Sequence, residues 1–169
     1  GSSAALDVDN RKVNGTGRVG DINGQWKKCG GTLKDCSNDG TVRTSKTYAG
    51  GIVGAIRDLT ADTRITIDSC INHGNLTAGT VDASVGGIVG KATDSSVAAT
   101  LQIANCVNTG NFTGTSDETK AGDGIMGGQS MSTLATYITR NRNYGTYPGV
   151  ICCGIFGYKQ DVKVPILPR

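Results

Sequence analysis

The sequence predicts an all-β protein, a β-solenoid (parallel β-helix) of about four coils, with roughly 35 residues and three short strands per coil. Three observations predict this fold. A ten-residue segment recurs at nearly constant spacing, a glycine-rich block follows each copy, and the composition disfavours helices. The chain has 26 glycines and 5% aromatic residues, and its apolar residues are mostly Ile, Val and Ala. Such a composition favours strands joined by tight turns.

The recurring segment is built around cysteine and asparagine. Its second copy, residues 67–76, reads Ile-Asp-Ser-Cys-Ile-Asn-His-Gly-Asn-Leu and aligns with 33–42, 103–112 and 138–147. The cysteine position recurs after 34, 36 and 35 residues, and the last copy has Asn141 there. Because a stack of coils places equivalent residues above one another, we expect two structural columns. One holds the free, buried thiols of Cys36, Cys70 and Cys106. The other holds turn amides that bond to one another and to the backbone, namely Asn38, Asn72, Asn108 and Asn143.

The glycine-rich block reads Gly-Gly-Ile-Val-Gly at 50–54 and 86–90, with variants at 123–127 and 153–157. It indicates a backbone turn followed by a strand, and the stack would then bury three apolar columns. Their members are Leu33, Ile67, Ile103 and Ile138; Val42, Leu76, Phe112 and Tyr147; and Ile52, Ile88, Ile125 and Ile155. We interpret residues 1–30 as an N-terminal cap or lead-in, 31–157 as the four-repeat solenoid, and 158–169 as an extended C-terminal tail.

Two copies share the pattern Cys-x-Asn-x-Gly-Asn-apolar-Thr, at 70–77 and 106–113, and the first of them is followed by Gly-Gly-Ile-Val-Gly. In these residues the chain resembles the GLUG-motif repeats of bacterial surface and secreted adhesin-like proteins. Such repeats also occur in non-catalytic parts of IgA-specific metallopeptidases. The resemblance covers roughly residues 31–157 and implies an extracellular, non-enzymatic module. The fourth copy departs most from the pattern and is interpreted as an end coil.

The sequence gives no reason to assign a catalytic, cofactor-binding or metal-binding residue. The one histidine, His73, falls at a variable turn position, and no His-Glu-x-x-His stretch is present. The glycine blocks lack the Lys-Ser/Thr of a phosphate-binding loop. We therefore expect a non-enzyme without a cofactor. A polysaccharide lyase or hydrolase is kept as an alternative, with a groove lined by Asp58, Asp62, Asp68 and Asp94.

The expected function is a secreted or cell-surface structural or adhesive module, an adhesin segment or fibre subunit that assembles through its ends or its C-terminal tail. Its partners would be further copies of the chain, or a host or environmental glycan or protein. The alternative from another class is a carbohydrate-binding module. Its candidate stacking residues are Trp26, Tyr48, Tyr137, Tyr144 and Tyr147.

Two classes of partner are not expected. The net charge is +3, and the basic residues form no run or face, so the pattern does not predict nucleic-acid binding. No apolar run approaches the ~20 residues that insertion into a membrane requires.

Two sets of residues keep open interpretations. Asn14, Asn75 and Asn111 begin Asn-x-Thr sequons. They are N-glycosylation sites if the source glycosylates, although the repeat alone accounts for two of them. The remaining cysteines, Cys29, Cys152 and Cys153, lie outside the cysteine column. Their disulfide connectivity cannot be read from the sequence.

Overall fold

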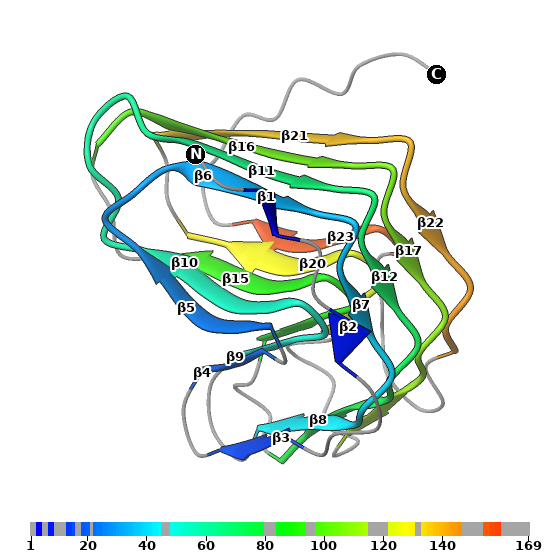
Figure 1. Ribbon diagram of the computed structural model, residues 1–169. Helices are drawn as coiled ribbons and strands as arrows, with labels where there is room; N and C mark the ends of the chain where they lie inside the picture. Colours follow the sequence, from blue (N-terminus) through cyan, green and yellow to red (C-terminus); the bar gives the residue numbers. More distant parts are fainter. Residues whose placement is uncertain are drawn as a thin grey trace.

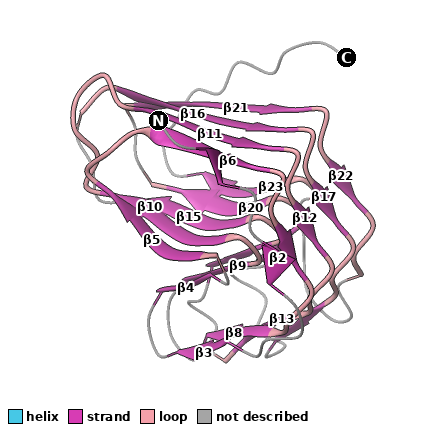
Figure 2. Cartoon of the chain, in the orientation of Figure 1, coloured by secondary structure: helices cyan, strands magenta, loops and turns pink. Residues whose placement is uncertain are grey.

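The computed structural model describes residues 3–4, 7–8, 13–15, 18–20, 22–44, 48–79, 84–93, 97–114, 122–130, 133–146 and 154–159. Regular secondary structure in these ranges is entirely β-strand, and the strands stack in parallel as a β-solenoid (Figures 1 and 2). The predicted fold class is confirmed. The described ranges contain no helix long and apolar enough to cross a membrane.

Each complete coil contains five short strands. The first coil contains β1 (Ser3–Ala4), β2 (Asp7–Val8), β3 (Val13–Gly15), β4 (Arg18–Gly20) and β5 (Asn23–Lys27). The second contains β6 (Gly31–Lys34), β7 (Ser37–Asn38), β8 (Val42–Thr44), β9 (Tyr48–Gly50) and β10 (Val53–Arg57). The third contains β11 (Arg64–Asp68), β12 (Ile71–Asn72), β13 (Leu76–Ala78), β14 (Ser84–Gly86) and β15 (Val89–Thr93).

The last two coils repeat this order. The fourth contains β16 (Ala99–Ala104), β17 (Val107–Asn108), β18 (Phe112–Gly114), β19 (Gly122–Asp123) and β20 (Met126–Gln129). The fifth contains β21 (Leu134–Thr139), β22 (Arg142–Asn143) and β23 (Phe156–Lys159). Residues 147–153 and most of the expected C-terminal tail, 160–169, lie outside the described ranges.

Equivalent strands of successive coils form five parallel sheets, which we number in chain order. Sheet 1 is β1-β6-β11-β16-β21, sheet 2 is β2-β7-β12-β17-β22, and sheet 3 is β3-β8-β13-β18. Sheet 4 is β4-β9-β14-β19, and sheet 5 is β5-β10-β15-β20-β23. Five strands per coil differ from the expected three. Strands of two or three residues are too short to show alternation of apolar and polar residues, so the sequence analysis took several of them for turns.

The stack also begins earlier than the expected boundary at residue 31. Strands β1 to β5 pair in register with β6 to β10, so these five strands add a coil before the expected first one. The lone tryptophan, Trp26 of β5, is 8% exposed and lies in register with Ile56. Its indole N–H donates to the carbonyl oxygen of Cys29 at 3.0 Å. This side chain therefore packs over the apolar core at the N-terminal end of the stack.

The expected apolar columns are present. In sheet 1, Ile67 pairs with Leu33 on one side and Ile103 on the other. In sheet 3, Leu76 pairs with Val42 and Phe112, whereas Tyr147 lies outside the described ranges. The Ile52 column follows the same register, since successive members bond through their backbones.

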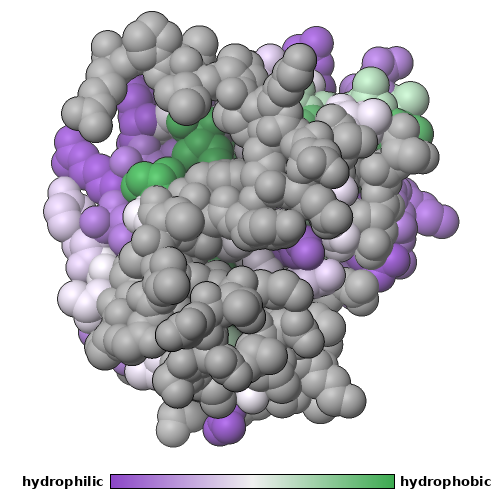
Figure 3. Space-filling model, turned by 180° about the vertical axis from the view of Figure 1, so that it is seen from behind, coloured by the Kyte–Doolittle hydropathy of each residue, from purple (hydrophilic) through white to green (hydrophobic). Residues whose placement is uncertain are grey.

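Buried apolar residues form two separate clusters. The larger lies between sheets 1 and 5 and includes Ile56, Ile67 and Leu101. The smaller lies between sheets 3 and 4 and is made of Val42, Ala49, Leu76, Val85 and Phe112. The described surface seen from behind is mostly hydrophilic, and apolar residues show in small areas only (Figure 3). Each coil therefore encloses two apolar regions, and a polar element lies between them.

Candidate functional site

The polar element is a ladder of asparagine side chains. The Nδ2 of Asn38 donates to Oδ1 of Asn72 at 2.7 Å, Asn72 donates to Asn108 at 2.7 Å, and Asn108 donates to Asn143 at 2.9 Å. The first three residues are 0% exposed, and Asn143 is half-buried. The structure thus brings all four asparagines of the repeat into one line along the stack, and we call this line the asparagine ladder.

Each asparagine also bonds to the turn that follows it. The Nδ2 of Asn72 donates to the carbonyl oxygen of Gly74 at 2.9 Å, and that of Asn108 to Gly110 at 3.0 Å. The amide N–H of Gly40 donates to Oδ1 of Asn38 at 2.9 Å. A buried amide costs stability unless its donors and acceptors are paired. Here the next coil and the local turn supply those partners together.

The two glycine motifs of the repeat meet at this ladder. A Cβ atom added to Gly87, in the Gly-Gly-Ile-Val-Gly block, would lie 2.5 Å from Cγ of Asn108 and would collide with the carbonyl oxygen of Gly124. A Cβ atom added to Gly74, in the asparagine turn, would lie 2.7 Å from Nδ2 of Asn38. Both glycines are required because a side chain there would occupy the space of the amides. The two motifs are opposite sides of one contact, which the sequence analysis did not connect.

The cysteine column lies two residues before the ladder. Cys36, Cys70 and Cys106 are thiols rather than halves of a disulfide, and they are at most 1% exposed. Each thiol lies near a carbonyl oxygen of its own coil, as Cys70 Sγ does at 3.4 Å from Asp68 and Cys106 Sγ at 3.2 Å from Ala104. The adjacent Cys106 thiol and burial together raise the pKa of the Cys70 thiol. A thiol held protonated in this way is not a nucleophile. Cys29 is free and exposed, whereas Cys152 and Cys153 lie outside the described ranges.

The last coil closes the cysteine column with an amide. Asn141 Oδ1 accepts from the backbone N–H of Cys106 at 2.8 Å, and its Nδ2 donates to the carbonyl oxygen of Ile103 at 2.8 Å. One side chain therefore satisfies two backbone groups of the coil before it.

The residue just before the cysteine position, or before Asn141 in the last coil, has a left-handed backbone conformation. Asp35, Ser69, Asn105 and Arg140 have φ angles of 53°, 54°, 56° and 53°. Asp and Asn tolerate this conformation better than most residues. The position turns the chain from sheet 1 into sheet 2, and the last coil places an arginine there.

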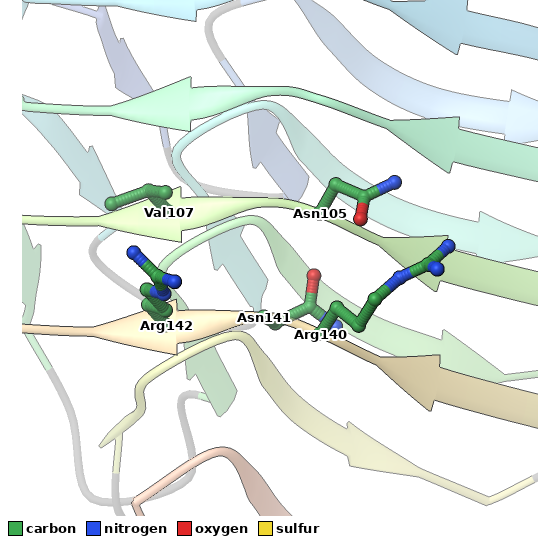
Figure 4. A pocket seen from close by; sticks show the side chains of 5 residues that line it. All are labelled: Asn105, Val107, Arg140, Asn141 and Arg142. Atoms are coloured by element: carbon green, nitrogen blue, oxygen red, sulfur yellow. The ribbon is translucent and has the colours of Figure 1, made fainter.

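A surface hollow lies at this corner, between the fourth and fifth coils (Figure 4). Its volume is about 440 Å³, and its lining residues are Asn105, Val107, Arg140, Asn141 and Arg142. The repeat pattern in the sequence does not predict this hollow. The only signal for it was that the fourth copy departs from the repeat at these positions.

Of the candidate stacking residues, two are well exposed. Tyr137 is 40% exposed and Tyr144 is 63% exposed. Tyr48 is half-buried under Lys91, whose Nζ lies 5.2 Å from the ring centroid, and Trp26 is buried. Both exposed tyrosines belong to the last coil.

The four candidate acidic residues do not form one described groove. Asp58 follows β10 and contacts Lys27 at 3.3 Å and Arg57 at 3.1 Å. Partial desolvation would raise the pKa of Asp58, but these two cations lower it below its usual value. Asp68 ends β11 and contacts Lys34 at 3.8 Å. Asp62 lies in a turn at φ 58°, and Asp94 is outside the described ranges.

His73 is exposed, and its Nδ1 lies 2.8 Å from the hydroxyl of Thr109 on the next coil. Histidine here extends a column of turn residues between coils. Among the described residues, no group of three or more His, Cys, Asp or Glu side chains is placed to hold a metal ion.

Two of the sequon asparagines form an exposed column. Oδ1 of Asn75 accepts from the backbone N–H of Asn111 at 3.0 Å, and Oδ1 of Asn111 accepts from that of Thr146 at 3.0 Å. Asn14 lies in β3 and pairs with Arg43, which places it in a different column from the other two. The sequons therefore do not form one continuous row.

A scan against protein-family models and searches among curated proteins and among solved structures returned no match to this chain. The resemblance to GLUG-motif repeats stays a prediction that rests on the motif residues.

Proposed function

We propose that this chain is a non-enzymatic, extracellular structural or adhesive module, a segment of a surface adhesin or a fibre subunit. The observation that supports the proposal is that repeated side chains hold the coils together, whereas many outward side chains vary. Repeated residues such as Asn72, Cys70 and Ile67 are buried in contacts between coils. Several outward positions change along the stack, and the middle column of sheet 1 reads Thr32, Thr66, Gln102 and Tyr137. Solenoids commonly present a binding surface on a scaffold of this kind.

The state of the candidate acids and thiols also supports a role without catalysis. A glycosidase-type general acid needs a carboxyl group whose pKa is raised. At Asp58, the neighbouring Lys27 and Arg57 lower the pKa instead. The thiols of Cys36, Cys70 and Cys106 are at most 1% exposed, which likewise disfavours a nucleophile that a substrate could reach.

The adhesive form of the proposal is tested by coating beads with the full chain and measuring retention on epithelial cells, bacterial cells and a polysaccharide array. We expect retention on at least one of these surfaces. Chromatography of the array polysaccharides after incubation should show no shortened products. Released oligosaccharides would instead support the lyase or hydrolase alternative.

The fibre form of the proposal concerns the ends of the stack. The described strands leave β1 to β5 as edge strands at one end and β18, β19, β21, β22 and β23 at the other. Unpaired edges can recruit another chain. We expect the intact chain to form oligomers in sedimentation velocity, and removal of residues 162–169 to reduce them. An intact chain that sediments as a monomer at all concentrations would contradict the fibre form and leave the adhesive form standing.

A carbohydrate-binding module is the second candidate, and the placement of Tyr137 and Tyr144 favours it. Sugar rings commonly stack on exposed aromatic faces, and these are the two large hydrophobic residues that the described surface exposes. Retention of the beads on polysaccharides but not on protein-coated surfaces would favour this candidate over a protein-binding adhesin.

A further inference from the structure

The hollow between the fourth and fifth coils brings two arginines to one corner. Figure 4 shows Arg140 below Asn105 and Arg142 below Val107, with Asn141 between the two arginines. Both guanidinium groups belong to exposed residues. A volume of about 440 Å³ falls within the range of ordinary small-ligand sites, which is about 300–1,000 Å³.

This positive charge is specific to the last coil. At the left-handed position before the cysteine column, the earlier coils carry Asp35, Ser69 and Asn105, and the last coil carries Arg140. In the neighbouring strand column they carry Ser37, Ile71 and Val107, and the last coil carries Arg142. Neither position takes part in the apolar core, so the arginines are not explained by packing.

The surrounding groups leave the charge of the hollow positive. Asp68, which contacts the lining residue Asn105, already has two partners: it pairs with Lys34 at 3.8 Å and accepts from Nδ2 of Asn105 at 2.6 Å. Within the described residues, neither Arg140 nor Arg142 forms an ion pair. Two guanidinium groups at one hollow therefore favour an anionic ligand, since each can bind a carboxylate or a sulfate through two hydrogen bonds.

The other side chains of this corner fit a sugar. Because Asn105 uses Nδ2 for Asp68, its Oδ1 faces the hollow as an acceptor for a hydroxyl group (Figure 4). Val107 supplies an apolar wall. Tyr144, 63% exposed, follows Arg142 by two residues, and Tyr137, 40% exposed, precedes Arg140 by three. Exposed aromatic residues before and after the two arginines in the chain suit a polymer in which apolar ring faces alternate with acidic groups.

We propose that this corner binds an acidic polysaccharide, with Arg140 and Arg142 holding its carboxylate or sulfate groups. The inference rests on the proposed adhesive function and names its ligand class. Nucleic acid fits less well, because neutralising a phosphate backbone commonly involves about 6–10 phosphate contacts and this corner offers two cations.

The test measures equilibrium binding of the full chain to immobilised heparin, polygalacturonate, uncharged dextran and single-stranded DNA. The variant is Arg140→Asn with Arg142→Ser, and both new residues already occupy the equivalent positions in other coils, as Asn105 and Ser37. The matched control is Arg64→Gln, which removes an exposed arginine from β11. A thermal unfolding midpoint unchanged by the double substitution shows that the fold is kept.

We expect the intact chain to bind heparin, polygalacturonate or both, and dextran much more weakly. The double substitution should weaken that binding at least about tenfold, and the control should stay within about twofold of the intact chain. Raising sodium chloride from about 50 mM to about 300 mM should weaken the binding of the intact chain to the acidic polysaccharide. Heparin alone would identify sulfate as the preferred group, and polygalacturonate alone would identify carboxylate.

Three results would overturn the inference: equal binding by the double variant and the control, equal binding to dextran, or tighter binding to DNA. Bead retention on cells distinguishes a failure of the arginine-site inference from a failure of the proposed adhesive function. Beads that adhere equally well with the intact chain and the double variant would reject the arginine site and leave the adhesive module standing.

Discussion

Two buried columns of this solenoid differ in what they do, although they lie two residues apart on the same strand-turn segment. The asparagine ladder links each coil to the next through side-chain hydrogen bonds, as Asn72 does with Asn38 and Asn108. The thiols of the cysteine column mainly fill space and bond weakly to nearby carbonyl oxygens. Burial and repetition alone therefore do not show how strongly a column couples the coils.

The ends of the two columns show the same contrast. The cysteine column changes residue type in the last coil, where Asn141 bonds to two backbone groups of the coil before. The ladder runs without interruption from Asn38 to Asn143. It stops at the first coil, where Val8 stands in register with Asn38. An asparagine that both donates to and accepts from neighbouring coils can be replaced by another residue type only at the end of the ladder.

The largest effect is expected for Asn72→Ala. The change leaves Nδ2 of Asn38 and the carbonyl oxygen of Gly74 without their partners inside the core. Each such unsatisfied group costs about 1–3 kcal/mol, so the free energy of unfolding should fall by about 3 kcal/mol. Chemical denaturation measures the fall. Asn75→Ala, an exposed position on the same turn, is the control and should cost less than about 1 kcal/mol. Equal losses would show that the ladder contributes little.

The next largest effect is expected for Gly87→Ala. The added methyl group would collide with Asn108 and with the backbone of Gly124. Overpacking of this kind costs typically about 1–3 kcal/mol, and we expect about 2 kcal/mol here. Gly79→Ala, at an exposed glycine, serves as the control in the same denaturation experiment. A Gly87→Ala protein as stable as the control would contradict the close contact between the glycine block and the ladder.

A smaller effect is expected for Cys70→Ser. The hydroxyl keeps a donor for the carbonyl oxygen of Asp68, which the thiol contacts at 3.4 Å. It loses the larger, polarisable sulfur in an apolar site, so the free energy of unfolding should fall by about 1 kcal/mol. A loss as large as that of Asn72→Ala would remove the distinction between the two columns.

The smallest effect concerns reactivity rather than stability. At about pH 8.5, near the ordinary pKa of a free thiol, iodoacetamide should label exposed Cys29 and leave buried Cys70 unlabelled. The reason is twofold, because Cys70 is inaccessible and its pKa is raised. Mass spectrometry of the proteolytic peptides measures the labelled fraction of each cysteine. Labelling of Cys70 at the rate of Cys29 in the folded protein would show that the column opens readily.

The register of the solenoid could be predicted from the sequence because one residue type recurs in each column. Isoleucine and leucine at 33, 67, 103 and 138 align in the structure as they do in the letters. The strand count could not be predicted in the same way. Strands such as Ile71–Asn72 have two residues, and hydrogen bonding between coils, rather than local pattern, makes them strands.

The first coil and the arginine hollow were missed for a related reason. Backbone pairing needs no particular side chains, so β1 to β5 stack on the next coil without resembling the repeat. The hollow consists of outward residues, which vary between coils. The aligned copies already place Arg140 and Arg142 where other coils carry uncharged or acidic residues, but only the structure shows that both positions border one hollow. The contact of Gly87 with Asn108 likewise joins residues whose proximity depends on the closed coil.

The asparagine ladder has a direction, because every Nδ2 in it donates toward the C-terminal coil. A shortened protein must therefore lose whole coils. Asn72 and Asn108 are 36 residues apart, so excising residues 72–107 joins Ile71 directly to Asn108 and leaves Asn38 facing an amide in the same orientation. Ladder rungs elsewhere in the stack are 34 or 35 residues apart, so removing another coil takes that length instead. Removing part of a coil would shift every later rung out of phase, and growth by gene duplication would likewise add whole coils.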